Sequence, residues 1–277
     1  MKERSPENLF PRKSLGQVFL SDLRILGKIV AATELQSTDS VLEIGPGMGV
    51  LTEHLSKNAK EIFAVERDQR FGQMLSEKFK DTNVRVIHQN ILKLPFENLP
   101  SHLIVVGNLP YYISSPILEL IIKNRARIKR AFIMVQREFG RRMIARPHTK
   151  DYSSLTCFIE YFTQAKILFA VGRNSFKPVP KVDSCFMRLD ILEKPRYHVT
   201  NETLLFNIIH ASFQHRRKTI TNAIKSLGWE ANFRKAVEHL KLKPTLRPEN
   251  LSVKDFCDIA NFIEEKNPGK NLKQEGD

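Results

Sequence analysis

The segment NLPYYISSPI, residues 108–117, places an amide, a proline and two tyrosines directly after the apolar run LIVVG. Asn and Pro are common turn residues, so one interpretation is a turn without chemistry. In the other, the side-chain oxygen of Asn108 and the backbone carbonyl of Leu109 accept hydrogen bonds from an exocyclic amine, and Pro110 fixes the turn. Tyr111 would then offer an aromatic face to a flipped base, an interaction typically worth ~1–3 kcal/mol.

A glycine-rich turn, EIGPGMG, lies between an apolar run and a helical pattern, with Gly45, Gly47 and Gly49 at alternate positions. Glycines there allow a tight strand-to-helix turn and a close approach of the backbone to a ligand. The dinucleotide fingerprint needs glycine at position 50, which is Val50. No Gly-Lys-Ser/Thr follows either, so the turn disfavours NAD and excludes a Walker phosphate loop.

Two further polar residues follow the next apolar runs. Glu66 comes 21 positions after Gly45 (66 − 45), where a carboxylate holds ribose hydroxyls in nucleoside-binding α/β sheets. Asn90 lies just beyond the next run and could accept from an adenine amino group. A solvated loop acid and an ordinary Asn turn are the respective alternatives. The glycine turn, the apolar run that follows it and the acid at the end of that run have the spacing of a nucleoside site. They favour a cofactor with adenosine but no pyrophosphate, which indicates S-adenosylmethionine.

Methyl transfer to the exocyclic amine of adenine fits these residue types. This amine is a poor nucleophile because its lone pair is delocalised into the ring, and two acceptors aimed at its hydrogens would favour a pyramidal nitrogen. The sulfonium is already a strong electrophile, so alignment at about 3–3.5 Å does most of the remaining work. No histidine or carboxylate base is required.

Seven apolar, mostly β-branched runs would position these residues. They are residues 41–44, 61–66, 84–88, 103–107, 131–136, 165–171 and 184–191, with helical patterns at 51–59, 69–79 and 116–124. Continuous apolar runs are typical of strands covered on both faces, and their alternation with helices favours a doubly wound parallel sheet. We therefore predict a Rossmann-like α/β fold with helices on both faces and a ligand at the carboxyl edge of the sheet.

The pattern changes after Lys194-Pro195. Four amphipathic helical patterns follow without a strand signal, at residues 203–213, 217–227, 233–240 and 253–265. We predict a domain boundary near 193–200 and a small all-α domain beyond it.

Charge indicates the kind of partner. The chain of 277 residues has 44 Lys and Arg against 30 Asp and Glu, a net charge of +14. Residues 123–150 hold ten basic and one acidic residue, and residues 215–247 hold nine basic and two acidic. Two such clusters favour a polyanion, most simply a phosphate backbone, over a solvated surface or an anionic membrane.

Cysteine usage and hydropathy suggest the compartment. Cys157, Cys185 and Cys257 are scattered and lack metal-ligand spacing, so we expect reduced, partly buried thiols, no metal and a cytoplasmic location. No apolar run approaches the ~20 residues of a membrane span, and the N-terminus has no secretory signal.

Taken in order, the sequence blocks resemble one family over nearly the whole chain: the ribosomal RNA adenine dimethyltransferases of the small subunit (the KsgA type). The blocks are PRKSLGQVFLSD, EIGPGMGVLT, VERD, GNLPYYISSPI, MVQREFGRRM, FKPVPKVDS, FQHRRKTI and LRPENLSV. The resemblance implies a class I methyltransferase that dimethylates two adjacent adenines near the 3′ end of 16S rRNA and releases S-adenosylhomocysteine. It also implies small-subunit rRNA and 30S-type assembly intermediates as partners and a role in subunit biogenesis; we expect a monomer.

The resemblance assigns roles to matching positions. Residues 1–22 would form an arm closing over the cofactor, residues 23–193 the cofactor-binding domain, and residues 194–277 a helical RNA-binding domain. Cofactor contacts are implied for Gln17, Val18, Leu20, Gly45, Gly47, Glu66, Asn90 and Asn108. Tyr111 and Phe176 would sandwich the target adenine, although a phenylalanine such as Phe176 is, by composition alone, more often a plain core residue. RNA contacts are implied for Arg141, Arg142, Lys181, Arg216, Arg217 and Lys218.

Two positions depart from the common family pattern. Val18 replaces an Asn, which removes a side-chain polar contact, and Asn90 replaces an acid. Both changes could weaken cofactor binding, and neither touches the segment from Asn108 to Tyr111. Tyr112 has no implied role, and we expect it to be a packing residue.

Two alternatives stay open. A resistance-type methylase of large-subunit rRNA would usually read Asn-Ile-Pro-Tyr and lack the KVDS block, so Leu109 and residues 181–184 disfavour it. A non-catalytic ribosome-assembly or transcription factor could keep the fold and bind RNA, and the departures at Val18 and Asn90 are what favour it. Binding of S-adenosylmethionine would separate the enzymes from the factor.

Overall fold

The computed structural model describes Phe10, residues 17–225 and residues 230–266. Most of the predicted arm, residues 1–9 and 11–16, therefore lies outside the described part, as does the C-terminal segment 267–277. Contacts divide the chain into two compact units. The first holds the residues up to Gly140 together with Ala165–Glu193, and the second holds Arg141–Gln164 together with the residues from Lys194 onward.

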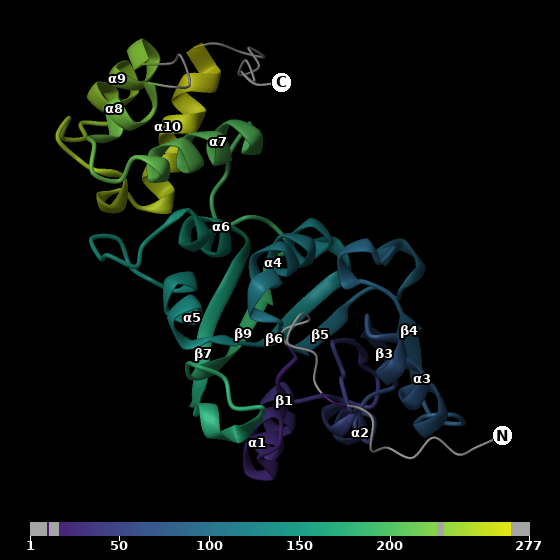
Figure 1. The fold of residues 1–277 in the computed structure, drawn as a ribbon. Coiled ribbons are helices and arrows are strands. Elements are labelled where there is room, and N and C mark those ends of the chain that lie inside the picture. Colours follow the sequence, from purple (N-terminus) through teal and green to yellow (C-terminus); the bar gives the residue numbers. More distant parts are fainter. Residues whose placement is uncertain (1–9, 11–16, 226–229, 267–277) are drawn as a thin grey trace. The chain divides into compact units, whose positions relative to one another are not determined.

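A seven-stranded sheet forms the centre of the first unit, in the order β4-β3-β2-β5-β6-β9-β7 (Figure 1). Its strands are β2 (Ser40–Ile44), β3 (Glu61–Glu66), β4 (Val84–His88), β5 (Leu103–Asn108), β6 (Ile128–Gln136), β7 (Thr163–Val171) and β9 (Ser184–Ile191). All seven predicted strands are confirmed. The pairs among β2 to β6 are parallel, but β9 runs antiparallel to β6, with Arg130 opposite Asp190. The sheet is therefore mixed, which a prediction of parallel strands did not include.

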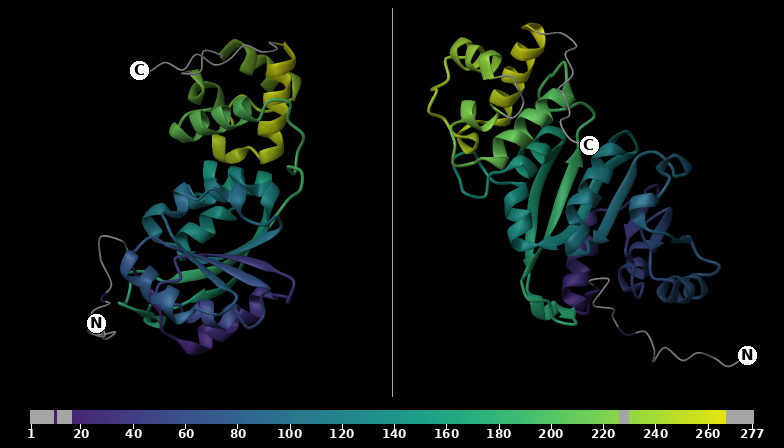
Figure 2. Two further views of the ribbon diagram at one scale, coloured as in Figure 1. Left: turned by 90° about the vertical axis from the view of Figure 1, so that its right-hand side faces the viewer. Right: turned by 45° about the horizontal axis from the view of Figure 1, so that its top comes forward.

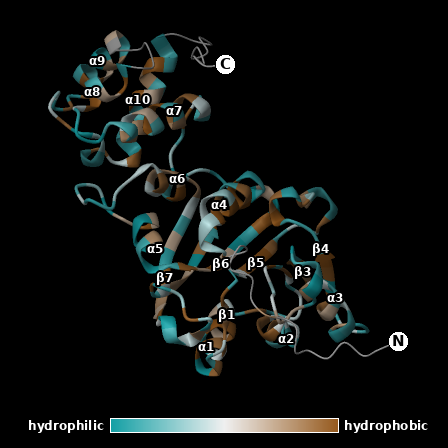
Figure 3. Ribbon diagram, viewed as in Figure 1, coloured by the Kyte–Doolittle hydropathy of each residue, from teal (hydrophilic) through white to brown (hydrophobic). Residues whose placement is uncertain are grey.

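Helices cover both faces of this sheet. They are α1 (Leu23–Thr33), α2 (Val50–Leu55), α3 (Gln69–Lys78), α4 (Ser114–Lys123) and α5 (Arg137–Met143), with short 3-10 turns at Ile91–Lys93, Phe96–Asn98, Tyr111–Ile113, Arg125–Arg127 and Arg173–Ser175. Figure 2 shows α1 and α2 on one face and α4 on the other. Every residue of β2 and the first five of β5 are buried, and the hydrophobic colouring of β5 in Figure 3 reflects this. The α/β fold with two covered faces is confirmed.

A second, two-stranded sheet joins distant parts of the first unit. Strand β1 (Phe19–Leu20) pairs antiparallel with β8 (Phe176–Lys177). Ser21 N–H and Asp22 N–H both donate to the Ser175 carbonyl, at 2.8 and 3.3 Å. Residues 17–22 of the predicted arm are thus fastened to the segment that precedes β9.

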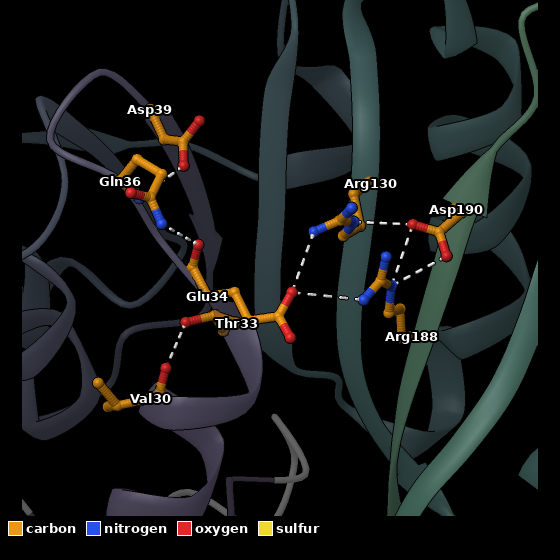
Figure 4. A network of polar contacts seen from close by, with 8 residues as sticks. All are labelled: Val30, Thr33, Glu34, Gln36, Asp39, Arg130, Arg188 and Asp190. Atoms are coloured by element: carbon orange, nitrogen blue, oxygen red, sulfur yellow. Dashed lines mark hydrogen bonds and ion pairs between the residues drawn. The ribbon is translucent and has the colours of Figure 1, made fainter.

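A network of ion pairs lies at the amino end of the parallel strands (Figure 4). Asp190 Oδ1 lies 2.7 Å from Arg130 Nε, and Asp190 Oδ2 lies 2.9 Å from Arg188 Nε. Glu34, in the left-handed conformation at the C-terminus of α1, completes it at 3.6 Å from Arg188 and 4.0 Å from Arg130. Burial alone would raise the pKa of Asp190, but the hydrogen bonds from Arg188 and Arg130 outweigh it and lower the pKa.

The second unit is helical. Its elements are α6 (Ser154–Phe162), α7 (Glu202–Gln214), α8 (Ile220–Ala223), α9 (Glu230–His239), a 3-10 turn (Pro248–Asn250) and α10 (Val253–Lys266). The contacts divide the chain after Glu193, and they also assign residues 141–164 to the helical unit, which the sequence analysis placed in the cofactor-binding domain. The reason is aromatic packing: the Phe206 ring of α7 lies 5.6 Å from both Phe158 and Phe162 of α6.

The three cysteines are free thiols, as expected, and all are buried rather than partly buried. In the described ranges, no helix is both long and apolar enough to cross a membrane.

Candidate active site

A pocket opens at the carboxyl ends of β2, β3, β4 and β5. It is lined by all eleven residues that the sequence analysis assigned to the cofactor or to the amine: Gln17, Val18, Leu20, Gly45, Gly47, Glu66, Asn90, Asn108, Leu109, Pro110 and Tyr111. These residues come from five separate segments. The parallel arrangement of the strands is what brings them to one edge.

The glycine turn between β2 and α2 has a backbone that only glycine adopts readily. Gly45, Gly47 and Gly49 have φ values of 69°, 57° and 74°. A Cβ atom on Gly47 would lie 2.6 Å from the ring of Phe19. The turn therefore keeps room for both a ligand and the residue of β1 that packs against it.

Glu66 is the last residue of β3, and two backbone N–H groups hold its carboxylate. Gly47 N–H donates to Oε2 at 3.1 Å, and Asp68 N–H donates to Oε1 at 2.8 Å. Burial raises the pKa of Glu66, and the two backbone donors partly offset this. Each oxygen accepts one backbone hydrogen bond and keeps a lone pair, so the carboxylate can accept from a vicinal diol.

Glu43 is a pocket residue that the sequence analysis missed. It lies inside β2, is 2% exposed and lines the pocket, and its Oε2 has no hydrogen-bond partner in the part of the chain that is described. Burial raises the pKa of Glu43 to about 7. The available signal was a carboxylate within the apolar run VLEI, because a buried acid without a partner is costly unless a ligand supplies one.

Asn90 lines the pocket but uses its side chain locally. Its Oδ1 accepts from Leu92 N–H at 3.2 Å and caps the 3-10 turn at 91–93. Both the turn interpretation and the ligand interpretation therefore stay compatible with its position, since the oxygen has a second lone pair.

Asn108 ends β5, and its amide has a defined orientation. Nδ2 donates to the backbone carbonyl of Val18 at 2.9 Å, so Oδ1 is the atom left to accept from a ligand. Leu109 is anchored by its N–H to the Met134 carbonyl at 3.0 Å. The substitution at Val18 thus leaves a polar contact in place, because the contact uses the backbone.

Comparisons with known proteins agree with this geometry. The family model described as ribosomal RNA adenine dimethylase matches residues 9–265. The chain belongs to the ribosomal RNA adenine dimethylase family. Relatives named ribosomal RNA small subunit methyltransferase A are similar to it: one from Clostridium botulinum is 38% identical (91% of this chain, 93% of the relative) and one from Streptococcus thermophilus is 39% identical (92% of each).

Solved structures show the same fold. A dimethyladenosine transferase from Plasmodium falciparum superposes with a TM-score of 0.77 at 29% identity, over 87% of this chain and 95% of that one. The 23S rRNA methyltransferase ErmE superposes with a TM-score of 0.69 at 26% identity, over 89% of this chain and 99% of that one.

S-adenosylmethionine is the cofactor of this dimethylase family, and the pocket fits it chemically. Glu66 would accept from the ribose hydroxyls, and the unpartnered oxygen of the buried Glu43 would accept from the ammonium group. The glycine turn would lie against the adenosine and methionine parts of the cofactor. These assignments would give the buried Glu43 oxygen a donor and would use the remaining lone pairs of Glu66.

The two tyrosines of the dimethylase turn differ in placement. Tyr111 is half-buried, lines the pocket and shares a 2.8 Å hydrogen bond between its OH and Ser184 Oγ; burial raises its pKa. Tyr112 also lines the pocket but is 54% exposed. The expectation that Tyr112 is a packing residue is therefore wrong, because the 3-10 turn at 111–113 directs its ring to solvent.

Phe176 does not occupy the predicted stacking position. It is 0% exposed, pairs with Leu20 across β1 and β8, and packs in the core with Ile104 and Phe186. It is not among the described residues that line the pocket. This placement fits the core interpretation, and the stacking of Phe176 on a target adenine stays a prediction.

The predicted RNA-binding residues lie in both units. Lys181 is exposed between β8 and β9 of the first unit, whereas Arg141, Arg142, Arg217 and Lys218 are exposed in the second. Arg216 is partly exposed and donates from Nη1 to the Lys150 carbonyl at 2.8 Å. The RNA-binding role of all six residues stays a prediction.

Proposed function

We propose that this dimethylase transfers methyl groups from S-adenosylmethionine to the exocyclic amines of two adjacent adenines near the 3′ end of 16S rRNA. Two dimethyladenosines and S-adenosylhomocysteine would be the products. The observation that carries the proposal is the orientation of Asn108, whose Nδ2 is used by the Val18 carbonyl while its oxygen remains for the amine.

The chain's own residues would act by binding and alignment. Asn108 Oδ1 and the Leu109 carbonyl accept the two amine hydrogens and turn the nitrogen lone pair out of conjugation. Tyr111, fixed through Ser184, supports the base by stacking. Once it has taken the methyl group, the amine nitrogen carries a positive charge and is strongly acidic, so its proton can pass to solvent without a dedicated base. The bound cofactor supplies the electrophilic methyl group.

Small-subunit rRNA is favoured over large-subunit rRNA as the substrate. The relatives at 38–39% identity carry the small-subunit name, whereas the 23S enzyme ErmE is 26% identical. Leu109 and the KVDS block at 181–184 point the same way. The non-catalytic alternative still rests on the departures at Val18 and Asn90, and binding of S-adenosylmethionine would argue against it.

We further propose that the substrate is a 30S-type assembly intermediate, that the enzyme acts as a monomer in the cytoplasm, and that methylation is linked to small-subunit biogenesis. The test is tritiated methyl transfer to under-methylated small-subunit particles, with the modified nucleosides identified afterwards. Dimethyladenosine in 16S rRNA is the expected product. Label in 23S rRNA alone, or none with cofactor bound, would refute the assignment.

The second unit and Lys181 would hold the RNA backbone. Replacement of Arg216, Arg217 and Lys218 by Ala should weaken RNA binding and lower the slope of log K against log salt by about 2–3, roughly one for each phosphate that is no longer neutralised. The matched control is the triple change of Lys57, Lys60 and Lys80 to Ala, which removes equal charge from exposed positions of the first unit outside both basic clusters. An unchanged slope in the first variant would show that residues 216–218 do not touch phosphate.

A further inference from the structure

Three sets of contacts fasten residues 17–22, hereafter the arm segment, to the first unit. Gln17 Nε2 donates to Asp68 Oδ2 at 3.1 Å, and the Val18 carbonyl accepts from Asn108 at 2.9 Å. Phe19 and Leu20 pair with β8. The pairing with β8 fixes the arm segment at one side of the pocket, and Asp68 fixes it at the other.

Asp68 is the most heavily bonded of these anchors. Its side chain is 2% exposed and lies 2.6 Å from Arg70 Nη2. Oδ1 also accepts from Arg70 Nε at 3.0 Å and from Arg70 N–H at 3.1 Å. The Arg70 guanidinium reaches the Phe10 carbonyl as well, at 3.5 Å. The hydrogen bonds from Arg70 lower the pKa of Asp68 to about 2, so the anchor is charged at any working pH.

Asp68 also contacts Glu66, the residue assigned to the ribose hydroxyls. Its backbone N–H donates to Glu66 Oε1 at 2.8 Å, two residues earlier in the chain. One residue therefore holds the arm segment through its side chain and orients Glu66 through its backbone. A change at the Asp68 carboxylate should affect the arm and leave the backbone donor in place.

The arm segment in turn orients the catalytic amide. An Asn side chain can turn either its oxygen or its nitrogen toward a neighbour, and only the nitrogen can face a carbonyl. The Val18 carbonyl therefore selects the rotamer in which Asn108 Oδ1 is free for the amine. Without the arm segment in place, this selection is lost.

We propose that Asp68 is a positioning residue that holds the arm segment closed, and that closure both completes the cofactor pocket and orients Asn108 for methyl transfer. The consequence for catalysis rests on the proposed function, whereas the consequence for cofactor affinity does not. A protein that binds its ligand only when closed has an apparent Kd equal to the intrinsic Kd divided by the closed fraction. Loss of the anchor lowers that fraction.

A purely structural role for Asp68 makes a different prediction. Asp68 also caps the N-terminus of α3 by accepting from Arg70 N–H. Asn caps helices about as well as Asp, so Asp68→Asn keeps the cap while it replaces the carboxylate oxygen that accepts from Gln17. The variant also weakens the ion pair with Arg70, so its melting temperature should fall; weak cofactor binding by protein that is still fully folded at the assay temperature separates the anchor from the cap.

The test is a double-mutant cycle read by calorimetry with S-adenosylmethionine. Gln17→Glu places two carboxylates against each other, and Asp68→Asn removes the ionic acceptor. Each should weaken cofactor binding by roughly tenfold, the cost of one charge-assisted hydrogen bond. The double variant should recover much of the affinity, because an amide at 68 can donate to a carboxylate at 17. Glu53→Gln is the control, since it breaks an exposed ion pair to Lys78 of 2.9 Å in the same unit.

Steady-state kinetics on under-methylated particles give the second readout. The single variants should lower kcat and raise the KM for cofactor, with the KM for RNA unchanged. Single variants that bind cofactor like the wild type, or a double variant as weak as the product of the singles, would overturn the anchor. Failure of the proposed function would instead appear as a wild type that binds cofactor and methylates nothing, and the calorimetric cycle would still decide on Asp68.

Discussion

The two ends of the seven-stranded sheet both gather charged side chains, but they satisfy them differently. At the amino end, Asp190 accepts hydrogen bonds from both Arg130 and Arg188, and Glu34 adds a second carboxylate (Figure 4). At the carboxyl end, Glu43 has a buried oxygen without a partner in the described residues. Glu66 there is held by backbone N–H groups.

The difference separates stability from function within one sheet. A carboxylate paired with arginine favours its charged form and stabilises the fold, whereas a buried unpartnered carboxylate destabilises the fold until a ligand arrives. Changes at the amino end should therefore lower stability and leave chemistry alone. Changes at the carboxyl end should impair cofactor binding or methyl transfer without lowering stability.

The largest effect is expected at the carboxyl end. Asn108→Ala removes the amine acceptor and should lower kcat for methyl transfer by about 1000-fold, as the loss of a preorganised polar group typically does. RNA binding and the melting temperature should stay near those of the wild type. Methyl transfer at the wild-type rate would exclude the proposed contact between Asn108 and the amine.

Glu43→Gln tests whether the pocket acid destabilises the unliganded protein. Its folded pKa of about 7 lies above the ordinary 4.5, so the folded protein holds this proton more tightly than the unfolded chain. Stability from this group is complete below about pH 4.5 and is lost as pH rises through about 7. The ligand-free variant should thus be more stable than the wild type at pH 8, by up to about 3 kcal/mol, yet bind cofactor more weakly.

Chemical denaturation at pH 5 and pH 8 measures this difference, and calorimetry measures the affinity. The stability gain should be small at pH 5, where the wild-type acid is mostly protonated. A gain that is equal at both pH values would contradict the raised pKa.

Asp190→Ala is the counterpart at the amino end. It removes the acceptor of two arginines and should lower the free energy of unfolding by about 1–2 kcal/mol, reduced from the buried value because Asp190 is 31% exposed. The folded pKa of Asp190 is lowered, so this stability is present above pH 3.8 and fades as pH falls through the folded pKa. Cofactor affinity should not change, and a clear loss would couple the two ends.

The smallest effect is expected from Asn90→Asp. A carboxylate keeps the cap on Leu92 N–H and adds a charged acceptor at the pocket, so cofactor binding should tighten by a few-fold. Calorimetric titration of the variant and of the wild type with S-adenosylmethionine measures the change in affinity. Weaker binding would refute the interpretation of Asn90 as a weakened contact.

Much of the fold and the site could be predicted because the signals are local. The central strands contain near-continuous apolar runs, and the polar residues at the carboxyl ends of the parallel strands meet at one edge by topology alone. The positions of Glu66 and Asn108 at the pocket follow from this pattern.

What sequence could not supply depends on contacts between distant residues. The complete burial of Phe176 could not be predicted because it is set by pairing with Leu20, 156 positions away (176 − 20). Helix α6 joins the second unit through aromatic rings on α7, although its sequence lies between two strands of the sheet. The exposure of Tyr112 could not be predicted either, because two adjacent tyrosines carry no signal of which one is half-buried and which is exposed.

The pairing of β1 with β8 also has a consequence for synthesis. Translation proceeds from the N-terminus, and domains form as their sequence becomes available. Phe19 and Leu20 are made early, yet their partners are Phe176 and Lys177. A nascent chain that has already completed the glycine turn and the Asn108 turn still lacks the strand that holds the arm segment. The enzyme therefore acquires its methyl-donor pocket late in its own translation.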